Sequence, residues 1–153
     1  MVPGTILHDP NFRFHDGKAG NKLFVVLNDG RDGHYIAVKT TSRGDRYTFV
    51  YGCQVLGRFP HFYLPPQSCC LDGQSWLCLD EFYELDVSIL NKRLLDLAIN
   101  RIGVLPEPIT LEVMGCAISC DDISMAHAEN LRTVWKERKA ALEETSKAAS
   151  KGS

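Results

Sequence analysis

Three apolar, strand-forming segments carry polar side chains at one end, and these side chains are the candidates for chemistry. The segments are 23–27, 34–41 and 75–79. A charged group enters an apolar core only at high cost, so these ends should face a groove at the edge of a sheet. We expect one shared site that holds an anionic ligand. The polar side chains at these ends are Lys22, Lys39, Thr40, Thr41, Ser42, Asp80 and Glu81.

The segment 11–20 is a second source of candidate residues, and its composition predicts a long polar loop. It combines the aromatic rings of Phe12 and Phe14 with cations, a composition that stacks bases and binds phosphates. The alternative is a loop whose two Phe side chains fill the core. An imidazole such as that of His15 exchanges protons near neutral pH. The polar candidates of this segment are Arg13, His15, Asp16 and Lys18.

The elements that position these residues change from strands to helices along the chain. We expect short strands at 4–7, 20–27, 34–41, 75–79 and 82–86, a further short strand within 52–67, and either a strand or an irregular segment at 47–51. The turn residues 28–33 predict a hairpin, and Asp9-Pro10-Asn11 should end the first strand. Helical spacing of apolar residues predicts helices that end at Gly103, at Ile118 and near Leu142, with a frayed tail over 146–153.

Length and composition favour a single α+β domain over residues 1–153. The formal net charge of −2 argues against strong nonspecific binding to nucleic acid, although cations outnumber carboxylates in residues 1–63. No apolar run approaches the length of a membrane span, and residues 1–4 do not begin a secretory signal. The six cysteines are therefore expected to be reduced thiols in a cytoplasmic protein.

Zinc binding is an alternative reading of the middle of the chain. Soft ligands are dense there, but no Cys-x-x-Cys pair occurs and Cys78 lies in an apolar segment, so we predict no metal. The residues concerned are Cys53, His61, Cys69, Cys70 and Cys78.

Residues 2–90 resemble the MazF/PemK family of toxin endoribonucleases. The resemblance rests on Pro3-Gly4-Thr5-Ile6-Leu7, on Gly20-Asn21-Lys22 before an aliphatic strand, on the segment 36–42 that ends in Thr and Ser, and on the segment 75–86. It implies a small SH3-like barrel over about 2–87 followed by C-terminal helices over about 88–145, usually as a homodimer. The chain beyond residue 105 lies outside the resemblance.

The resemblance also implies an activity and a set of site residues. Family members cleave single-stranded RNA without a metal or cofactor, leaving a 2′,3′-cyclic phosphate and a 5′-OH, and a cognate antitoxin protein covers the groove. The implied catalytic residues are Lys22, Thr40, Asp80 and His15. The implied RNA-binding residues are Arg13, Asp16, Lys18, Lys39, Thr41, Ser42, Arg43 and Glu81.

Two positions depart from the family pattern. Lys22 stands where the family has an arginine, so a forked contact to phosphate is replaced by a point charge. Cys78 stands where some members have an arginine proposed as the general acid. These departures leave open a second function, a catalytically inactive barrel that binds a protein or RNA partner in the same groove.

Overall fold

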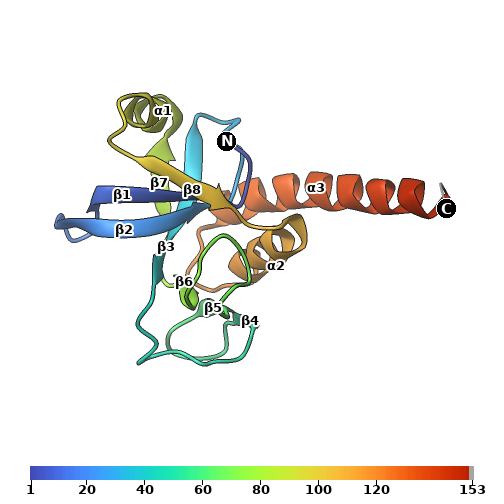
Figure 1. Cartoon of the computed structure of the whole chain (residues 1–153), viewed down its shortest axis with the longest axis horizontal. Helices are drawn as coiled ribbons and strands as arrows, with labels where there is room; N and C mark the ends of the chain where they lie inside the picture. The colour runs from blue at the N-terminus through green and yellow to red at the C-terminus, as the bar shows by residue number, and fades with distance from the viewer. Residues whose placement is uncertain (152–153) are drawn as a thin grey trace.

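The computed structural model describes residues 1–151, which form an α+β fold of eight strands and three helices (Figure 1). The elements in chain order are β1 (Thr5–Arg13), β2 (Ala19–Val26), β3 (His34–Thr41), β4 (Gly52–Gln54), β5 (His61–Leu64), β6 (Ser75–Cys78), β7 (Tyr83–Asp86), α1 (Val87–Leu95), β8 (Asn100–Val104), α2 (Glu107–Ile118) and α3 (Met125–Lys151).

The sheet is antiparallel and centred on β3. Its strand order is β4-β5-β6-β3-β2-β1-β8, and β7 also pairs with β3. One half of β3, His34–Ala37, pairs with β7, and its end, Thr40–Thr41, pairs with β6. The sheet is open, because among residues 1–151 no pairing joins β4 to β8.

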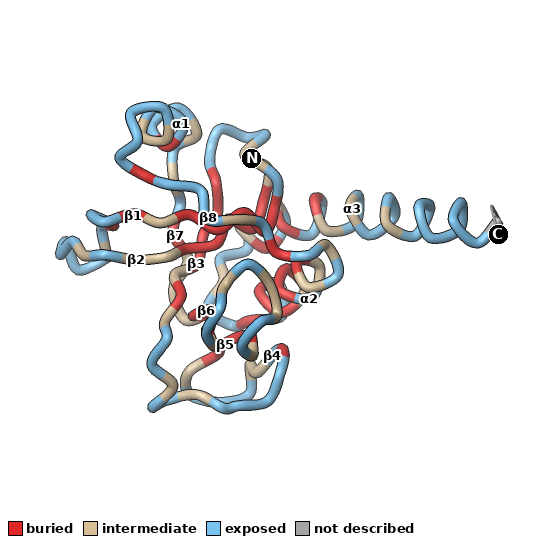
Figure 2. Tube along the Cα trace, viewed as in Figure 1, coloured by how far each residue is buried: buried red, intermediate tan, exposed pale blue. Residues whose placement is uncertain are grey.

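The apolar stretches of β2 and β3 are buried on both faces, as predicted, and so are Ile6 and Leu7 of β1. Side chains alternate between the faces of a strand, so neighbouring residues enter different cores. Val25 and Leu27 pack in one core with α2 and α3, whereas Phe24 and Val26 pack in a second core with β7 and α1. The buried stretches of these strands lie at the centre of the molecule in Figure 2. Burial on both faces explains why apolar and polar residues do not alternate along these strands.

The hairpin between β2 and β3 is confirmed, but the prediction for residues 9–20 is wrong. β1 continues through Asp9 and Pro10 to Arg13, with an irregularity in its pairing to β2 between Asp9 and Phe12. At this irregularity the buried carboxylate of Asp9 accepts the backbone N–H of Asn11 at 2.8 Å, so this N–H has a partner within β1. The segment 11–20 is therefore the tip of a second hairpin and not a long loop.

Helix α1 is shorter than its apolar spacing predicts. Asp86 caps its first turn by accepting the N–H of Ile89 at 2.9 Å. The helix ends because Leu97 takes a left-handed φ of 60°. Residues 100–104 then form β8 against β1, so Gly103 lies in a strand and does not end a helix.

The two C-terminal helices pack against each other at one side of the sheet. α2 begins at Glu107 and ends at Ile118, where its predicted end lies, and Trp135 of α3 donates its indole N–H to the Leu111 carbonyl oxygen at 3.1 Å. The N-terminal cap of α3 is Ser124, which accepts the N–H of His127. In Figure 1 the distal part of α3 extends away from the body of the molecule. The predicted frayed tail is helical as far as Lys151, and residues 152–153 lie outside the described residues.

The prediction of six free thiols is wrong for two cysteines. Cys53 of β4 and Cys116 of α2 form a disulfide, with their Cα atoms 5.5 Å apart. The two residues are 63 positions apart in the sequence, so only the packing of β4 beside α2 brings them together. No helix within residues 1–151 has the length and apolarity that crossing a lipid bilayer requires.

Candidate functional site

The candidate site forms where β2 and β3 separate. Their backbone pairing covers only Phe24–Lys39, Val25–Val38 and Val26–Ala37. Beyond these three pairs, one side chain of each strand donates a hydrogen bond to a backbone carbonyl oxygen of the other strand. The Lys22 ammonium donates to the Thr40 carbonyl oxygen at 3.2 Å, and the Thr40 hydroxyl donates to the Leu23 carbonyl oxygen at 3.1 Å. Lys22 therefore lies at a strand end, as predicted, and it bridges the two strands.

A cavity of about 660 Å³ lies beside this bridge. Three of its lining residues, Thr41, Ser42 and Arg43, continue from the end of β3. A fourth, His8, comes from β1, where it pairs with Leu23, and its Nε2 contacts the Asn21 side-chain oxygen. The full lining is His8, Asn21, Lys22, Leu23, Thr40, Thr41, Ser42, Arg43, Ser75 and Ile102. The cavity therefore combines an imidazole, two cations and several hydroxyls.

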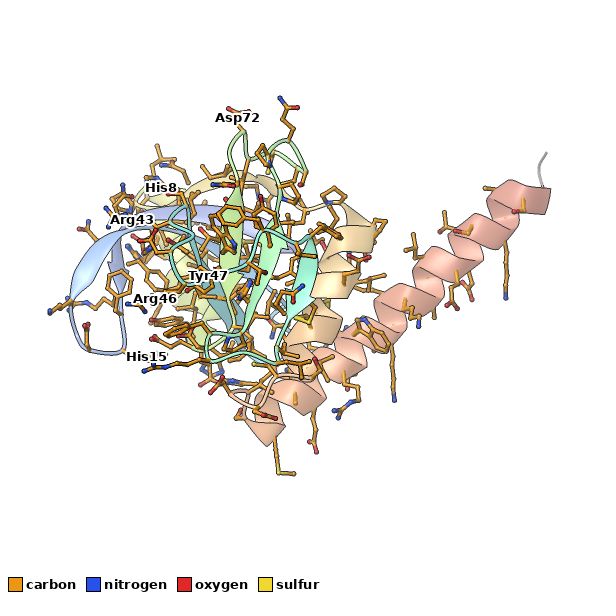
Figure 3. The ribbon with its side chains drawn as sticks, turned by 90° about the horizontal axis from the view of Figure 1, so that it is seen from below. His8, His15, Arg43, Arg46, Tyr47 and Asp72 are labelled. Atoms are coloured by element: carbon orange, nitrogen blue, oxygen red, sulfur yellow. A yellow bond between two sulfur atoms is a disulfide. The ribbon has the colours of Figure 1, made fainter. Side chains whose placement is uncertain are left out.

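A second cavity, of about 290 Å³, adjoins the first, and Lys22, Thr41 and Arg43 line both. Its wall is rich in cations, since Lys39 and Arg46 line it as well. The complete lining is Lys22, Lys39, Thr41, Arg43, Asp45, Arg46, Tyr47 and Cys78. Four cations against one carboxylate make this cavity attractive to an anion. Figure 3 labels His8, Arg43, Arg46 and Tyr47 on one side of the sheet.

The thiol and the phenol of the smaller cavity stay protonated at neutral pH. Burial raises the pKa of Cys78, and the nearby Asp80 adds to this, whereas its contact with Tyr47 and the charges of Lys39 and Lys22 oppose it. Burial also raises the pKa of Tyr47, whose hydroxyl lies 3.6 Å from the Cys78 sulfur. Both groups can therefore serve as proton donors in hydrogen bonds at the floor of the cavity.

His15 lies apart from this cavity pair, which we call the polar groove. Its ring stacks on Tyr83, with ring centroids 4.1 Å apart, and its Nε2 contacts the Phe82 carbonyl oxygen at 3.0 Å. Tyr83 donates to Glu81 at 2.7 Å, and Glu81 lies 3.7 Å from the ammonium of Lys39. His15 is thus connected to the groove only through a chain of contacts. In Figure 3, Arg43 and Arg46 lie between His8 and His15.

The other predicted site residues divide into two groups. Lys22, Lys39, Thr40, Thr41, Ser42 and Arg43 all line the polar groove. Asp80, half-buried, lies near enough to influence Cys78 but is not among the lining residues. Arg13, Asp16 and Lys18 are exposed at the tip of the β1–β2 hairpin, and none of them lines the groove.

The sequence predicts no role for His8, nor for Arg46 and Tyr47 in the loop after β3, although all three line the polar groove. The strand predicted from the sequence ends at Leu7, so the prediction places His8 on no face of a strand and in no site. Its place in the groove follows from the pairing of His8 with Leu23. A first strand predicted to continue through Pro10 would have placed His8 beside Leu23.

The alternative zinc ligands are not brought together. Cys53 is in the disulfide, and His61 contacts the Phe59 carbonyl oxygen through Nδ1 at 2.7 Å and the Thr48 hydroxyl through Nε2 at 3.0 Å. Across the part of the chain that the structure describes, no three His, Cys, Asp or Glu side chains are grouped so that they could hold a metal ion.

Comparisons with protein-family models, with curated proteins and with solved structures gave no match.

Proposed function

We propose that this protein is a metal-independent endoribonuclease that cleaves single-stranded RNA. The observation that carries the proposal is the meeting of His8, Lys22 and Arg43 on one cavity wall. An imidazole beside two cations provides the two elements of metal-free phosphodiester cleavage, a group that moves protons and positive charge that stabilises the phosphorane-like transition state.

The reaction would proceed by attack of the ribose 2′-oxygen on the adjacent phosphorus. The new bond is between the 2′-oxygen and phosphorus, and the bond that breaks is between phosphorus and the 5′-oxygen of the next nucleotide. The 2′-hydroxyl proton passes to a base and the 5′-oxygen takes up a proton, which gives a 2′,3′-cyclic phosphate and a 5′-OH. His8 is assigned the proton transfer, and the charges of Lys22 and Arg43 neutralise the phosphate.

The remaining groove residues have supporting roles in this proposal. Thr40 holds the strands at the separation, because its hydroxyl donates to the Leu23 carbonyl oxygen. Tyr47 lines the smaller cavity next to Cys78, the position at which the family resemblance leads one to expect an arginine, and its neutral phenol can donate to a phosphate oxygen. His15 and Asp80 remain candidates for proton transfer if RNA binding draws their segments toward the groove.

The wider context of the proposal comes from the family resemblance. The bent sheet, in which β6 and β7 pair in turn with β3, supports an SH3-like barrel of MazF/PemK type. The protein would then be the toxin of a type II toxin–antitoxin pair in the cytoplasm, a homodimer whose groove a cognate antitoxin covers.

A second function, a groove that binds RNA or a protein without catalysis, is favoured by one observation. The Thr40 hydroxyl is engaged with the backbone and is buried, so it is not free to take part in a reaction. The two functions share the same residues and differ in whether bound RNA is cut.

The test is incubation of the purified full chain with a long single-stranded RNA in the presence of a chelator. We expect discrete fragments with 5′-OH ends, which polynucleotide kinase labels without prior phosphatase treatment. His8→Ala and Lys22→Ala should each slow cleavage by about 100-fold or more, the usual effect of removing a proton-transfer group or a key charge. The matched control is His34→Ala, because His34 is exposed at the opposite end of β3.

Three results would contradict the proposal. Cleavage that stops in chelator would assign the activity to a metal. Cleavage that is unchanged in both groove variants would place the active site elsewhere. A wild-type protein that binds the RNA but leaves it intact would establish the binding module. A His15→Ala variant, assayed beside His8→Ala, decides which imidazole acts.

A further inference from the structure

The loop that follows β3 is held in one arrangement by Trp76. The indole N–H of this buried residue donates to the Thr48 carbonyl oxygen at 2.8 Å. Gly44 lies so close to the ring that a Cβ atom there would be 2.5 Å from it, which no side chain tolerates. A turn between Gly44 and Tyr47 completes the loop, with an N–H to carbonyl oxygen distance of 3.1 Å. Residues 42–50 are thus fixed although they form no strand.

This loop presents Phe49 to solvent in a defined orientation. Phe49 is 64% exposed, which is unusual for a phenyl ring with two aromatic neighbours. It meets Trp76 and Tyr63 edge to face, with ring centroids 5.4 Å and 5.9 Å apart. These contacts set the plane of the ring but leave most of its surface uncovered.

The exposed ring continues the polar groove. Phe49 and Arg43 line one further hollow of about 740 Å³, together with Ser42, Gly44, Asp45, Tyr47 and Gln74. Arg43 also lines both cavities of the groove, so the ring and the groove form one continuous surface. A flat aromatic surface therefore lies in the same hollow as Arg43, one of the cations that would hold a phosphate.

We propose that Phe49 is the stacking platform for a base of single-stranded nucleic acid whose phosphate contacts Arg43. Single-strand binding sites combine a cationic track for the backbone with aromatic rings for the bases, and this surface has both. The charge favours a nucleotide over an apolar peptide. Arg43 lines the hollow with Phe49, and Lys22, Lys39 and Arg46 line the smaller cavity that shares Arg43, while Asp45 is the one carboxylate among the lining residues of the two. This inference rests on the proposed function and adds to it the position of a base.

The experiment measures binding of two fluorescent probes to the full chain. One is a short, mixed-sequence 2′-O-methyl oligoribonucleotide, which lacks the attacking hydroxyl and so is not cut. The other has the same backbone with its bases removed. Phe49→Ala should weaken binding of the first probe by about 5- to 150-fold, which corresponds to about 1–3 kcal/mol for one stacked base. On the abasic probe it should change binding by no more than about twofold.

Two further variants keep the result specific. Phe49→Trp should retain the wild-type affinity, since any large aromatic ring can stack on a base. Ile89→Ala is the matched control, because Ile89 is 63% exposed but lies on α1. Circular dichroism and thermal unfolding confirm that each variant is folded.

The outcomes separate this inference from the proposed function. A wild-type protein that cleaves RNA while Phe49→Ala binds both probes normally would overturn the stacking platform alone. An equal loss on both probes would also overturn it, because the effect would not depend on a base. A wild-type protein that binds neither probe would overturn the stacking platform, and if it also left the long RNA intact it would overturn the proposed function as well.

Discussion

The salt dependence of nucleic-acid binding tests the polar groove most directly. Binding of single strands weakens with salt because each neutralised phosphate releases condensed counterions, and the logarithmic slope is about −0.7 per phosphate. Lys22, Lys39, Arg43 and Arg46 line the smaller cavity, and Lys39 shares its charge with Glu81 at 3.7 Å. The groove should therefore neutralise three to four phosphates, and the slope should lie between about −2 and −3.

The expected magnitudes follow from this slope. Between about 50 and 200 mM salt, wild-type affinity should fall by about 20- to 50-fold. Removing one contact with Arg43→Ala should reduce that fall to about 7- to 20-fold and the slope by about 0.7. Arg132→Ala is the matched control, because Arg132 is an exposed arginine on α3.

The assay is fluorescence anisotropy of the 2′-O-methyl probe across a series of salt concentrations. Equal slopes for wild type, Arg43→Ala and Arg132→Ala would refute the assignment of Arg43 to a phosphate. A smaller slope in Arg132→Ala than in Arg43→Ala would move the binding surface to α3.

Two predictions concern the framework that carries the groove. The Asp9 carboxylate is 2% exposed and accepts two hydrogen bonds from the Arg93 guanidinium, at 2.8 and 2.9 Å. Arg93→Ala leaves this buried charge without its partner, so it should reduce the free energy of unfolding, measured by urea titration, by about 3 kcal/mol. The adjacent exposed Lys92→Ala should cost less than about 0.5 kcal/mol, and equal losses in the two variants would contradict the argument. The Cys53–Cys116 disulfide joins residues 63 positions apart and so restricts a long loop of the unfolded chain. Its reduction should lower the free energy of unfolding by up to about 4 kcal/mol. Urea titrations that are the same with and without reductant would show that the disulfide contributes nothing.

The sequence predicted the central strands well because their signal is local. Side chains of the apolar segment that begins at Leu23 pack in two cores, one on each face of the sheet. Neighbouring side chains of a strand point to opposite faces, so an unbroken apolar segment requires a core on both. Gly30 and Gly33 adopt positive φ in the turn before β3, as their residue type permits. Asp86 caps α1, and such a cap is also local, since it depends on residues within one turn.

Residues 97–104 show where local reasoning fails. Apolar side chains at helical spacing favoured a helix to Gly103, but residues 100–104 pair with β1 and form β8. Pairing with a distant strand outweighs a weak helical propensity. The extended β1 was missed for the same reason, because its continuation through Pro10 depends on the irregular pairing with β2 and on the Asp9–Arg93 ion pair.

The candidate site divides in the same way. The sequence by itself placed Lys22, Thr40, Thr41 and Ser42 at strand ends, and these four line the groove, because a charge or hydroxyl at the end of a buried strand must find solvent or a partner. Asp80 and Glu81 were predicted at a strand end as well but do not line it. Three contacts are decided only by the tertiary structure. His8 and Lys22 line the same cavity, the His15 ring stacks on Tyr83, and Cys53 is bonded to Cys116. These contacts depend on strand register and helix packing between distant segments, which neighbouring residues do not encode.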